Sequence, residues 1–477
     1  MRLFDKIADI TADGVQFDSY IYALFLPVVF LSYWALRQHR RWQNMLLLAS
    51  SYVFYGWWDW RFLGLIAFTS LTTWGSALLM EGGRHRRLWA TLNIIINVAI
   101  LALFKYYDFF AVTAAQACHT LGFEPGWTTL NLVLPVGISF YTLQAVSYTI
   151  DVYRRDVKPT RDIVAFMTFI AFFPQLVAGP IERARDLLPQ MLTDRQWDYD
   201  EAVVGMRQIL WGLAKKIIVA DTISRALTTL LFHPAALDPS TIVIAAILFA
   251  IQIYADFSGY SDIAIGSARL LGIRLKSNFR YPYFSRNYRE MWRRWHQSLM
   301  RWMVAYVYIP LGGSRCSRSR RVFNTMVVFA LSGLWHGADW TFVMWGVING
   351  LLVSALIFIK VKERDEYARL REIPLILLNF ALMAAAFLIF RLDNMTQVAD
   401  CLHVLAHGNW RAVPLGLTAL ATAMPLFFVD WLGRREEFPL KRLPFPTPVR
   451  WLIYWTLLAL IAYYSQGDKL QYIYFQF

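Results

Sequence analysis

Residues 331–345 read LSGLWHGADWTFVMW, and they place His336 inside a run that is otherwise apolar enough to lie in a bilayer. An ionisable side chain at membrane depth is costly, so it is a functional-site hypothesis by default. Histidine can gain or lose a proton near neutral pH. The run therefore predicts a membrane protein with acid–base chemistry at His336.

The composition of the whole chain agrees with a membrane protein. The sequence is 57% hydrophobic and 16% aromatic, and its mean hydropathy is +0.39. Apolar runs of roughly 17–25 residues are long enough to cross a bilayer. We count about eleven such candidate spans, near residues 20–36, 42–58, 62–80, 88–112, 130–153, 163–181, 241–272, 340–360, 373–392, 412–433 and 448–467. The sequence thus predicts an all-α polytopic membrane protein.

Shorter or amphipathic pieces lie at 202–232, 286–309 and 322–337. Gly, Pro and paired polar residues also interrupt the apolar runs at 133–154, 172–186 and 252–274. Irregular backbone at membrane depth is tolerated where protein buries it or where it lines a wet cavity, so we expect re-entrant and interfacial helices as well. No internal repeat or long linker divides the chain. We therefore expect a single membrane domain over 1–477.

The net charge of +14 comes from 47 Lys and Arg against 33 Asp and Glu. The basic residues gather in short loops between spans, which is the positive-inside pattern of a multi-pass inner-membrane protein and not a nucleic-acid surface. These loops are residues 37–41, 84–87, 154–161, 315–321 and 434–442. They are expected to be cytoplasmic and to hold anionic membrane lipid. Binding of a phosphate-bearing donor by some of these arginines is the alternative. Cys118, Cys316 and Cys401 are scattered without metal-ligand spacing, so no metal is expected.

A second histidine, His296, lies in REMWRRWHQSLMRW at residues 289–302. On a helical wheel, the apolar arc holds the tryptophans of the segment 286–309 and the opposite arc holds Arg293, Gln297 and the other arginines. His296 falls at the seam between the two arcs. The pattern predicts one amphipathic helix in the interface plane, with its tryptophans at the level of the lipid headgroups.

The neighbours of His336 permit a close approach. Gly333 and Gly337 lie on either side of it, Trp335 supplies bulk, and Asp339 follows three residues on. A buried histidine that only satisfies a hydrogen bond is the alternative. Asp256, Ser258, Tyr260, Ser261 and Asp262 form a polar cluster in another apolar run, where a hydrogen-bond network between helices is weighed against substrate contact.

Several motifs in order resemble the membrane-bound O-acyltransferases, and within them the bacterial polysaccharide branch that includes alginate O-acetylation proteins and D-alanyl transfer proteins of teichoic acid. They occupy residues 134–154, 176–191, 252–273, 278–299, 308–315, 332–346 and the closing YIYFQF at 472–477. The motif-bearing core is about 130–346. In place of the Arg-Asp usual in the alginate branch, this chain has Val304-Ala305 before Tyr306.

The resemblance implies that His336 is the catalytic histidine and His296 the second active-site polar residue, in a core with a central tunnel. A thioester is already activated, so its transfer to a hydroxyl needs mainly a base and oxyanion stabilisation. His336 is the expected base, whereas His296 or Gln297 would orient the acceptor or donate to the thioester carbonyl. Trp335, Gln297, Asp256, Ser258, Tyr260 and Arg293 are the candidate substrate-binding residues. No Ser-His-Asp triad or G-x-S-x-G elbow can be assigned.

The expected function is therefore transfer of an acyl group, expected to be acetyl, from a cytoplasmic thioester across the membrane to an exported polysaccharide. Acetyl-CoA or an acyl-carrier is the expected donor, with no permanently bound cofactor. An exported SGNH-type acetyltransferase or other polysaccharide machinery is the expected partner. O-acylation of a lipid or protein is one alternative. A transporter is the alternative from another class, since buried polar residues and broken spans are also typical of transporters.

Overall fold

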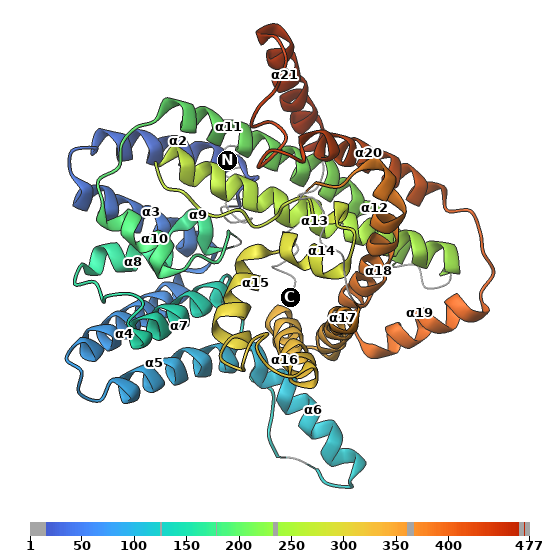
Figure 1. Ribbon diagram of the computed structural model, residues 1–477, viewed down its shortest axis with the longest axis horizontal. Coiled ribbons are helices and arrows are strands. Elements are labelled where there is room, and N and C mark those ends of the chain that lie inside the picture. The colour runs from blue at the N-terminus through green and yellow to red at the C-terminus, as the bar shows by residue number, and fades with distance from the viewer. Residues whose placement is uncertain are drawn as a thin grey trace, which may run out of the picture. The chain divides into compact units, whose positions relative to one another are not determined.

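The computed structural model describes residues 16–124, 126–177, 179–231, 237–359, 367–466 and 472, and every regular element among them is a helix (Figure 1). The predicted all-α class is confirmed. The chain packs as two compact units, one from residues 1–206 and 264–276 and the other from 207–263 and 277–477. The single membrane domain expected over the whole chain stays a prediction.

The first unit is built from helices that pack against one another. Its helices are α2 Tyr20–Ala35, α3 Arg40–Asp59, η1 Trp60–Phe62, α4 Leu63–Glu81, α5 Arg86–Leu101, η2 Ala102–Tyr106, α6 Tyr107–Thr120, α7 Ile138–Arg154, α8 Ile163–Ala171, α9 Phe173–Leu176 and α10 Ala184–Leu192. Buried polar side chains form hydrogen bonds between these helices. For example, the Thr149 hydroxyl on α7 donates to the side-chain oxygen of Asn93 on α5 at 2.7 Å. Such bonds satisfy groups that lipid cannot.

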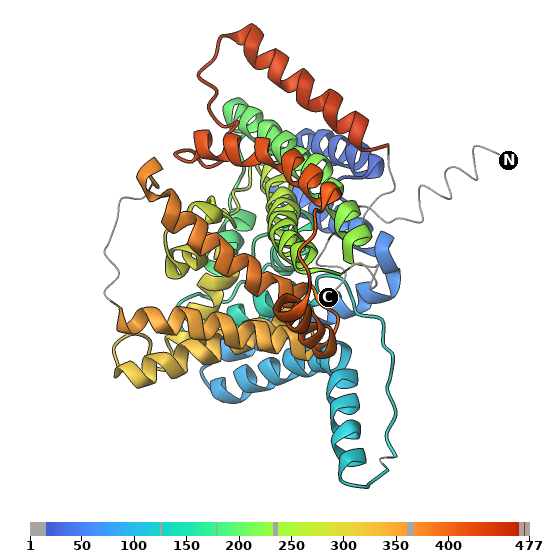
Figure 2. The same cartoon turned by 90° about the vertical axis from the view of Figure 1, so that its right-hand side faces the viewer.

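Two helices, α11 Tyr199–Leu213 and α13 Pro239–Leu270, carry the chain from one unit to the other. The second unit holds both histidines singled out above. Its remaining helices are η3 Ala214–Ala220, α12 Asp221–Leu231, η5 Pro282–Phe284, α14 Tyr288–Arg294, α15 Gln297–Met303, η6 Val304–Tyr308, α16 Arg318–His336, α17 Trp340–Phe358, η7 Leu370–Glu372, α18 Ile373–Arg391, α19 Met395–His407, α20 Pro414–Gly433 and α21 Thr447–Tyr464. Within it, α16 and α17 lie side by side along their length (Figures 1 and 2).

Six helical runs in the described part of the chain are long and apolar enough to cross a membrane. They are Arg40–Glu81, Arg86–Thr120, Pro239–Leu270, Trp340–Phe358, Leu370–Arg391 and Pro414–Gly433. The polytopic architecture is confirmed, but the expected count of eleven spans is not. The predicted spans 42–58 and 62–80 form one helical run. The predicted span 163–181 is interrupted at Phe172, where the backbone leaves the helical region with φ −51° and ψ 107°.

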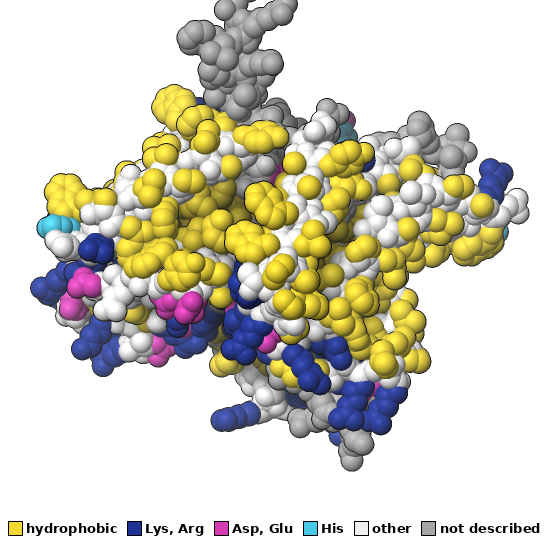
Figure 3. All heavy atoms as spheres, turned by 90° about the horizontal axis from the view of Figure 1, so that it is seen from above, with side chains coloured by type: hydrophobic (Ala, Val, Ile, Leu, Met, Phe, Trp, Pro, Cys, Tyr) yellow, Lys and Arg dark blue, Asp and Glu magenta, His cyan; other side chains and the backbone are white. Residues whose placement is uncertain are grey.

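Much of the visible surface is apolar, as lipid contact requires (Figure 3). On the last helix, α21, Leu452 and Trp455 are 66% and 64% exposed. A water-soluble protein rarely exposes apolar patches of more than a few hundred Å². The exposed apolar side chains and the six long helices together describe a multi-pass membrane protein.

Candidate active site

His336 is the last residue of α16. The helix ends there because Gly337 is extended, with φ −156° and ψ 155°. The next helix begins almost at once, since Asp339 caps α17 by accepting a hydrogen bond from the Thr341 N–H at 2.8 Å. Asp339 therefore shapes the turn that follows His336. His336 itself is buried, with 5% of its surface exposed.

The glycines beside His336 allow α17 to approach α16 closely. A Cβ on Gly333 would lie 2.2 Å from the carbonyl oxygen of Phe342, and one on Gly337 would lie 2.1 Å from the Phe342 ring. On the other helix, a Cβ on Gly346 would lie 2.4 Å from the carbonyl oxygen of Phe329. Since no Cβ tolerates such distances, the helix pair depends on these glycines. The predicted close approach at Gly333 and Gly337 is confirmed, and the group that approaches both glycines is Phe342 of α17.

The helix predicted over residues 286–309 is wrong as a single element. It breaks between α14, which ends at Arg294, and α15, which begins at Gln297. His296 lies at this break in the left-handed region, with φ 41° and ψ 51°. Only 1% of its surface is exposed, so it is a buried residue and not one at the seam of an interfacial helix.

The break has a tertiary cause. The Gln297 N–H donates to the carbonyl of Asn278 at 2.9 Å, and the Arg280 N–H donates to the carbonyl of Arg294 at 2.9 Å. The Ser298 hydroxyl adds a bond to the side-chain oxygen of Asn278 at 2.8 Å. These bonds to the segment 278–280 replace the helical bonds that a continuous helix would make. A left-handed conformation costs a non-glycine residue roughly 1–2 kcal/mol, and these bonds oppose that cost.

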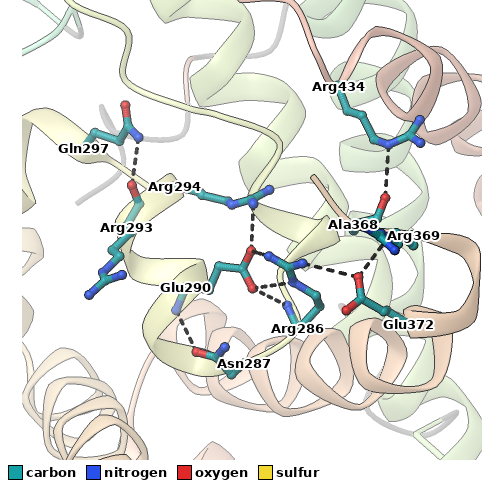
Figure 4. A network of polar contacts seen from close by, with 10 residues as sticks. All are labelled: Arg286, Asn287, Glu290, Arg293, Arg294, Gln297, Ala368, Arg369, Glu372 and Arg434. Atoms are coloured by element: carbon teal, nitrogen blue, oxygen red, sulfur yellow. Dashed lines mark hydrogen bonds and ion pairs between the residues drawn. The ribbon is translucent and has the colours of Figure 1, made fainter. Parts of the chain in front are cut away.

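The tryptophans of this segment also do not face lipid headgroups, as the predicted interfacial helix required. Trp292, Trp295 and Trp302 are 6%, 2% and 7% exposed, so they pack inside the protein. On the opposite arc, Arg286 is buried and ion-paired, because its guanidinium meets Glu290 at 2.6 Å and Glu372 at 3.3 Å (Figure 4). The wheel was misleading because the helix is broken and residues of both arcs, the tryptophans and Arg286, are buried in protein.

The break brings His296 to His336 across forty residues of sequence. The two imidazole centroids lie 6.2 Å apart. The Trp335 ring contacts both imidazoles, with its centroid 5.0 Å from that of His336 and 5.8 Å from that of His296. Trp345 and Phe390 each meet the His336 ring at 5.3 Å, and Phe257 meets the His296 ring at 4.6 Å. The two imidazoles therefore share an aromatic enclosure within the second unit.

The enclosure fixes the charge of His296, which lies outside the six long spans. Burial lowers the pKa of His296 to about 3, and the positive charge of Arg301 acts in the same direction. His296 is consequently neutral near pH 7. A neutral imidazole has one ring nitrogen that donates and one that accepts, which suits it to orienting a hydroxyl group.

The polar cluster on α13 is a hydrogen-bond network, as one of the two readings predicted. Asp262 accepts from the Lys215 ammonium at 2.5 Å, and Asp256 lies 3.0 Å from the Lys216 ammonium. The Lys215 ammonium also donates to Ser258 at 2.8 Å. Substrate contact by Asp256 and Ser258 stays a prediction.

The sequence reasoning missed the lysines of this network. Lys215 and Lys216 are 3% and 1% exposed. They lie in the π-helical turn η3, and π-turns are frequent at functional sites. The available signal was an adjacent lysine pair in the apolar run LWGLAKKIIVAD at 210–221. Charged residues in such a run call for partners, which α13 supplies.

Three further candidates occupy different surroundings. Gln297 donates its amide to the backbone carbonyl of Arg293 at 2.7 Å, and Arg293 is exposed on α14 (Figure 4). Arg293 thus does not share the enclosure of the buried histidines. Tyr260 stacks on Tyr472 with centroids 4.2 Å apart. Tyr472 is the first residue of the closing YIYFQF motif, and the rest of that motif lies outside the described residues.

Comparison with known proteins places the chain in a family. The family described as "MBOAT, membrane-bound O-acyltransferase family" matches residues 160–392. "Probable alginate O-acetylase AlgI" of Azotobacter vinelandii is 37% identical over 409 residues, covering 84% of this chain and 79% of that protein. "Peptidoglycan O-acetyltransferase" of Helicobacter pylori is 31% identical over 416 residues, covering 79% and 77%.

"Teichoic acid D-alanyltransferase" of Bacillus subtilis is 25% identical over 352 residues, covering 69% of this chain and 85% of that protein. The matched range 160–392 includes the buried pair His296 and His336 and the helices that hold them. With relatives above 30% identity over most of both chains, the protein is an enzyme that belongs to the membrane-bound O-acyltransferase family.

Proposed function

We propose that this enzyme moves an acetyl group from a cytoplasmic thioester, acetyl-CoA, to a hydroxyl group of an exported polysaccharide, with His336 as the general base. The observation that carries the choice of site is the pair of buried imidazoles, 6.2 Å apart, inside one aromatic enclosure. The names of the relatives concern alginate, peptidoglycan and teichoic acid, which favours a polymer as the final acceptor. The chain's membership of an acyltransferase family leaves no support for a transporter.

The reaction needs no covalent enzyme intermediate. His336 takes the proton of the acceptor hydroxyl while the hydroxyl oxygen attacks the thioester carbonyl carbon, and the carbonyl electron pair moves onto its oxygen. When this pair returns, the carbon–sulfur bond breaks and the thiolate leaves with the sulfur electrons. The protonated His336 then returns the proton to the thiolate. The products are an ester and a thiol, and the base is restored.

His296 has a positioning role in this proposal. Its ring lies beside that of His336, and Asn278 holds the backbone on its C-terminal side. A neutral imidazole at this place can accept from the acceptor hydroxyl or donate to the thioester carbonyl. Trp335 contacts both rings and would exclude water from the reacting groups. The remaining candidates, Gln297, Asp256, Ser258, Tyr260 and Arg293, stay predicted substrate contacts.

The inner membrane is the proposed location, with the basic loops in the cytoplasm and the acyl group passing through a central tunnel to the outer side. An exported SGNH-type acetyltransferase is the proposed relay to the polymer. The sequence supports this arrangement through the clustering of arginine in short loops, such as residues 315–321 before α16.

The deciding experiment is mass spectrometry of surface glycans from cells with and without the gene, together with transfer from labelled acetyl-CoA by the purified enzyme in proteoliposomes. We expect the loss of an acetyl ester from the glycan and a label that moves to a hydroxyl acceptor. Loss of a D-alanyl or longer acyl ester would overturn the acetyl assignment. Loss of an ester only from lipid or protein would overturn the assignment of a polysaccharide as the acceptor.

A further inference from the structure

Two tryptophans of the second unit have buried indole N–H groups that find no hydrogen-bond acceptor in the described chain. Trp345 and Trp292 are 1% and 6% exposed. Buried indole N–H groups usually find a partner, and one that does not calls for an explanation such as a ligand or a catalytic role.

Only one of the two indoles contacts the proposed base. The Trp345 ring meets His336 edge to face, with centroids 5.3 Å apart and an interplanar angle of 89°. The ring contacts of Trp292 are with Tyr288, Phe329 and Trp345. Of these two indoles, the ring of Trp345 is therefore the one that adjoins the proposed base.

Packing holds the Trp345 ring in one orientation. Phe387 stacks on it at 6.1 Å with an angle of 23°, and Phe390 meets its edge at 5.2 Å. Its backbone is fixed as well, because Asn349 donates to the Trp345 carbonyl at 2.7 Å and accepts from the Tyr288 hydroxyl at 2.6 Å. A donor that is held before the reaction costs no reorganisation when charge develops.

A second buried donor lies one helical turn before His336 on α16. Ser332 is 1% exposed, and its hydroxyl has no hydrogen-bond partner in the described chain. Helical serines commonly bond the carbonyl four residues earlier, as Ser51 does to Leu47 at 2.7 Å and Ser70 does to Ile66 at 2.7 Å. Residues one turn apart share a helix face, so Ser332 lies on the same side of α16 as His336.

We propose that the Trp345 indole N–H, assisted by the Ser332 hydroxyl, donates a hydrogen bond to the carbonyl oxygen of the transferred acyl group and stabilises the oxyanion that forms there. This rests on the proposed function for the position of the reaction at His336. During attack, the carbonyl electron pair moves onto the oxygen that accepts these bonds. It returns when the carbon–sulfur bond breaks, and Trp345 neither gains nor loses a proton.

The test replaces Trp345 by 3-benzothienylalanine, in which sulfur takes the place of the N–H and the ring size is kept. The full-length enzyme in proteoliposomes is assayed with an acetyl thioester donor and a hydroxyl acceptor. Loss of one oxyanion donor lowers kcat by on the order of 100-fold. We expect a loss of that size with little change in the KM of the donor, and a smaller loss for Ser332→Ala.

Trp292 is the matched control, because it has the same buried N–H without the contact to His336. The same replacement there is expected to leave kcat within about twofold of the wild type. Wild-type kcat for the Trp345 replacement, with His336→Ala inactive, would overturn this inference and leave the proposed function standing. A large loss at Trp292 and none at Trp345 would overturn the choice of donor. An active His336→Ala enzyme would remove the proposed function itself.

An acyl donor whose carbonyl oxygen is replaced by sulfur distinguishes a hydrogen-bonding role of Trp345 from a packing role. Sulfur accepts hydrogen bonds weakly, so this donor should slow the wild type more than it slows the Trp345 replacement. Equal slowing of the two enzymes would show that Trp345 only fills space, and the inference would fail. Trp345→Phe, which also lacks the N–H, repeats the comparison if the isosteric replacement does not fold.

Discussion

The two histidines have different local settings although their rings are neighbours. His336 ends a regular helix, whereas His296 lies at a break in the left-handed region. The first is placed by helix packing and the second by hydrogen bonds to residues 278–280. This difference predicts different consequences for their replacement.

His336→Ala is expected to abolish acyl transfer while the protein remains inserted and folded, because the proposed role is proton transfer. Activity is measured on the purified enzyme in proteoliposomes, and folding by gel filtration and thermal unfolding. His407→Ala is the control, since His407 is exposed on α19. Transfer at the wild-type rate by His336→Ala would remove the central claim.

Replacement of His296 by Asn is expected to lower kcat by on the order of 100-fold, as misplacement of a reacting group does. Asn tolerates the left-handed backbone at this position, so the fold should be kept better than in His296→Ala. Complete loss in both His296→Asn and His336→Ala, with donor binding intact, would instead indicate a shared proton relay. Unchanged activity would make His296 a packing residue.

At the scale of elements, the pair α16 and α17 determines the position of the site. Gly333 and Gly346 bring the two backbones together, so the distance between His336 and Trp345 depends on glycine at both positions. The broken helix α14–α15 then sets His296 against this pair. In the same unit, the π-turn η3 presents two buried lysines to carboxylates of α13.

Gly346→Ala should destabilise the protein and lower activity, because its Cβ would lie 2.4 Å from the Phe329 carbonyl oxygen. Such overpacking costs typically about 1–3 kcal/mol. Gly75→Ala on α4 is the control, since no atom lies within 4 Å of its Cβ. It should stabilise by roughly 0.5–1 kcal/mol through helix propensity. Thermal unfolding in detergent measures both, and an unchanged midpoint for Gly346→Ala would contradict the packing.

Lys215→Met should lower the free energy of unfolding by up to about 3 kcal/mol, because it leaves the Asp262 carboxylate, whose side chain is only 15% exposed, without its cation. The double variant Lys215→Met, Asp262→Asn should recover most of the loss. For comparison, Arg161→Met removes the ion pair with Glu81, whose side chains are 83% and 47% exposed, and should change stability by about 1 kcal/mol or less. Equal losses at Lys215 and Arg161 would contradict a buried network.

For the whole molecule, the testable property is sidedness. Single cysteines are placed at Ser319 and Asn409, both exposed, in a background that lacks Cys118, Cys316 and Cys401. If the basic loops are cytoplasmic, an impermeant thiol reagent added to intact cells should label Asn409→Cys and not Ser319→Cys. Labelling of both from outside would overturn the topology and the passage of the acyl group through the protein.

The sequence by itself determined the polytopic helical class and the positions of most helices, and it singled out His336 as the candidate base. These follow from local properties, because backbone polar groups in a membrane must be hydrogen-bonded within the chain, and a long apolar run achieves this most simply as a helix. Gly333 and Gly337 were likewise visible in the sequence as residues that permit a close approach.

Only the tertiary structure decided the break at His296, the burial of Trp292 and Arg286, and the partners of Lys215 and Lys216. Helical periodicity assumes that each N–H bonds within its own helix. In this protein two residues outside the predicted helix take part instead. The Gln297 N–H bonds the carbonyl of Asn278, and the carbonyl of Arg294 accepts from the Arg280 N–H. The contact of Trp345 with His336 also depends on how two helices pack. The residue pattern of one segment cannot reveal the hydrogen bonds and contacts that a different segment of the chain supplies.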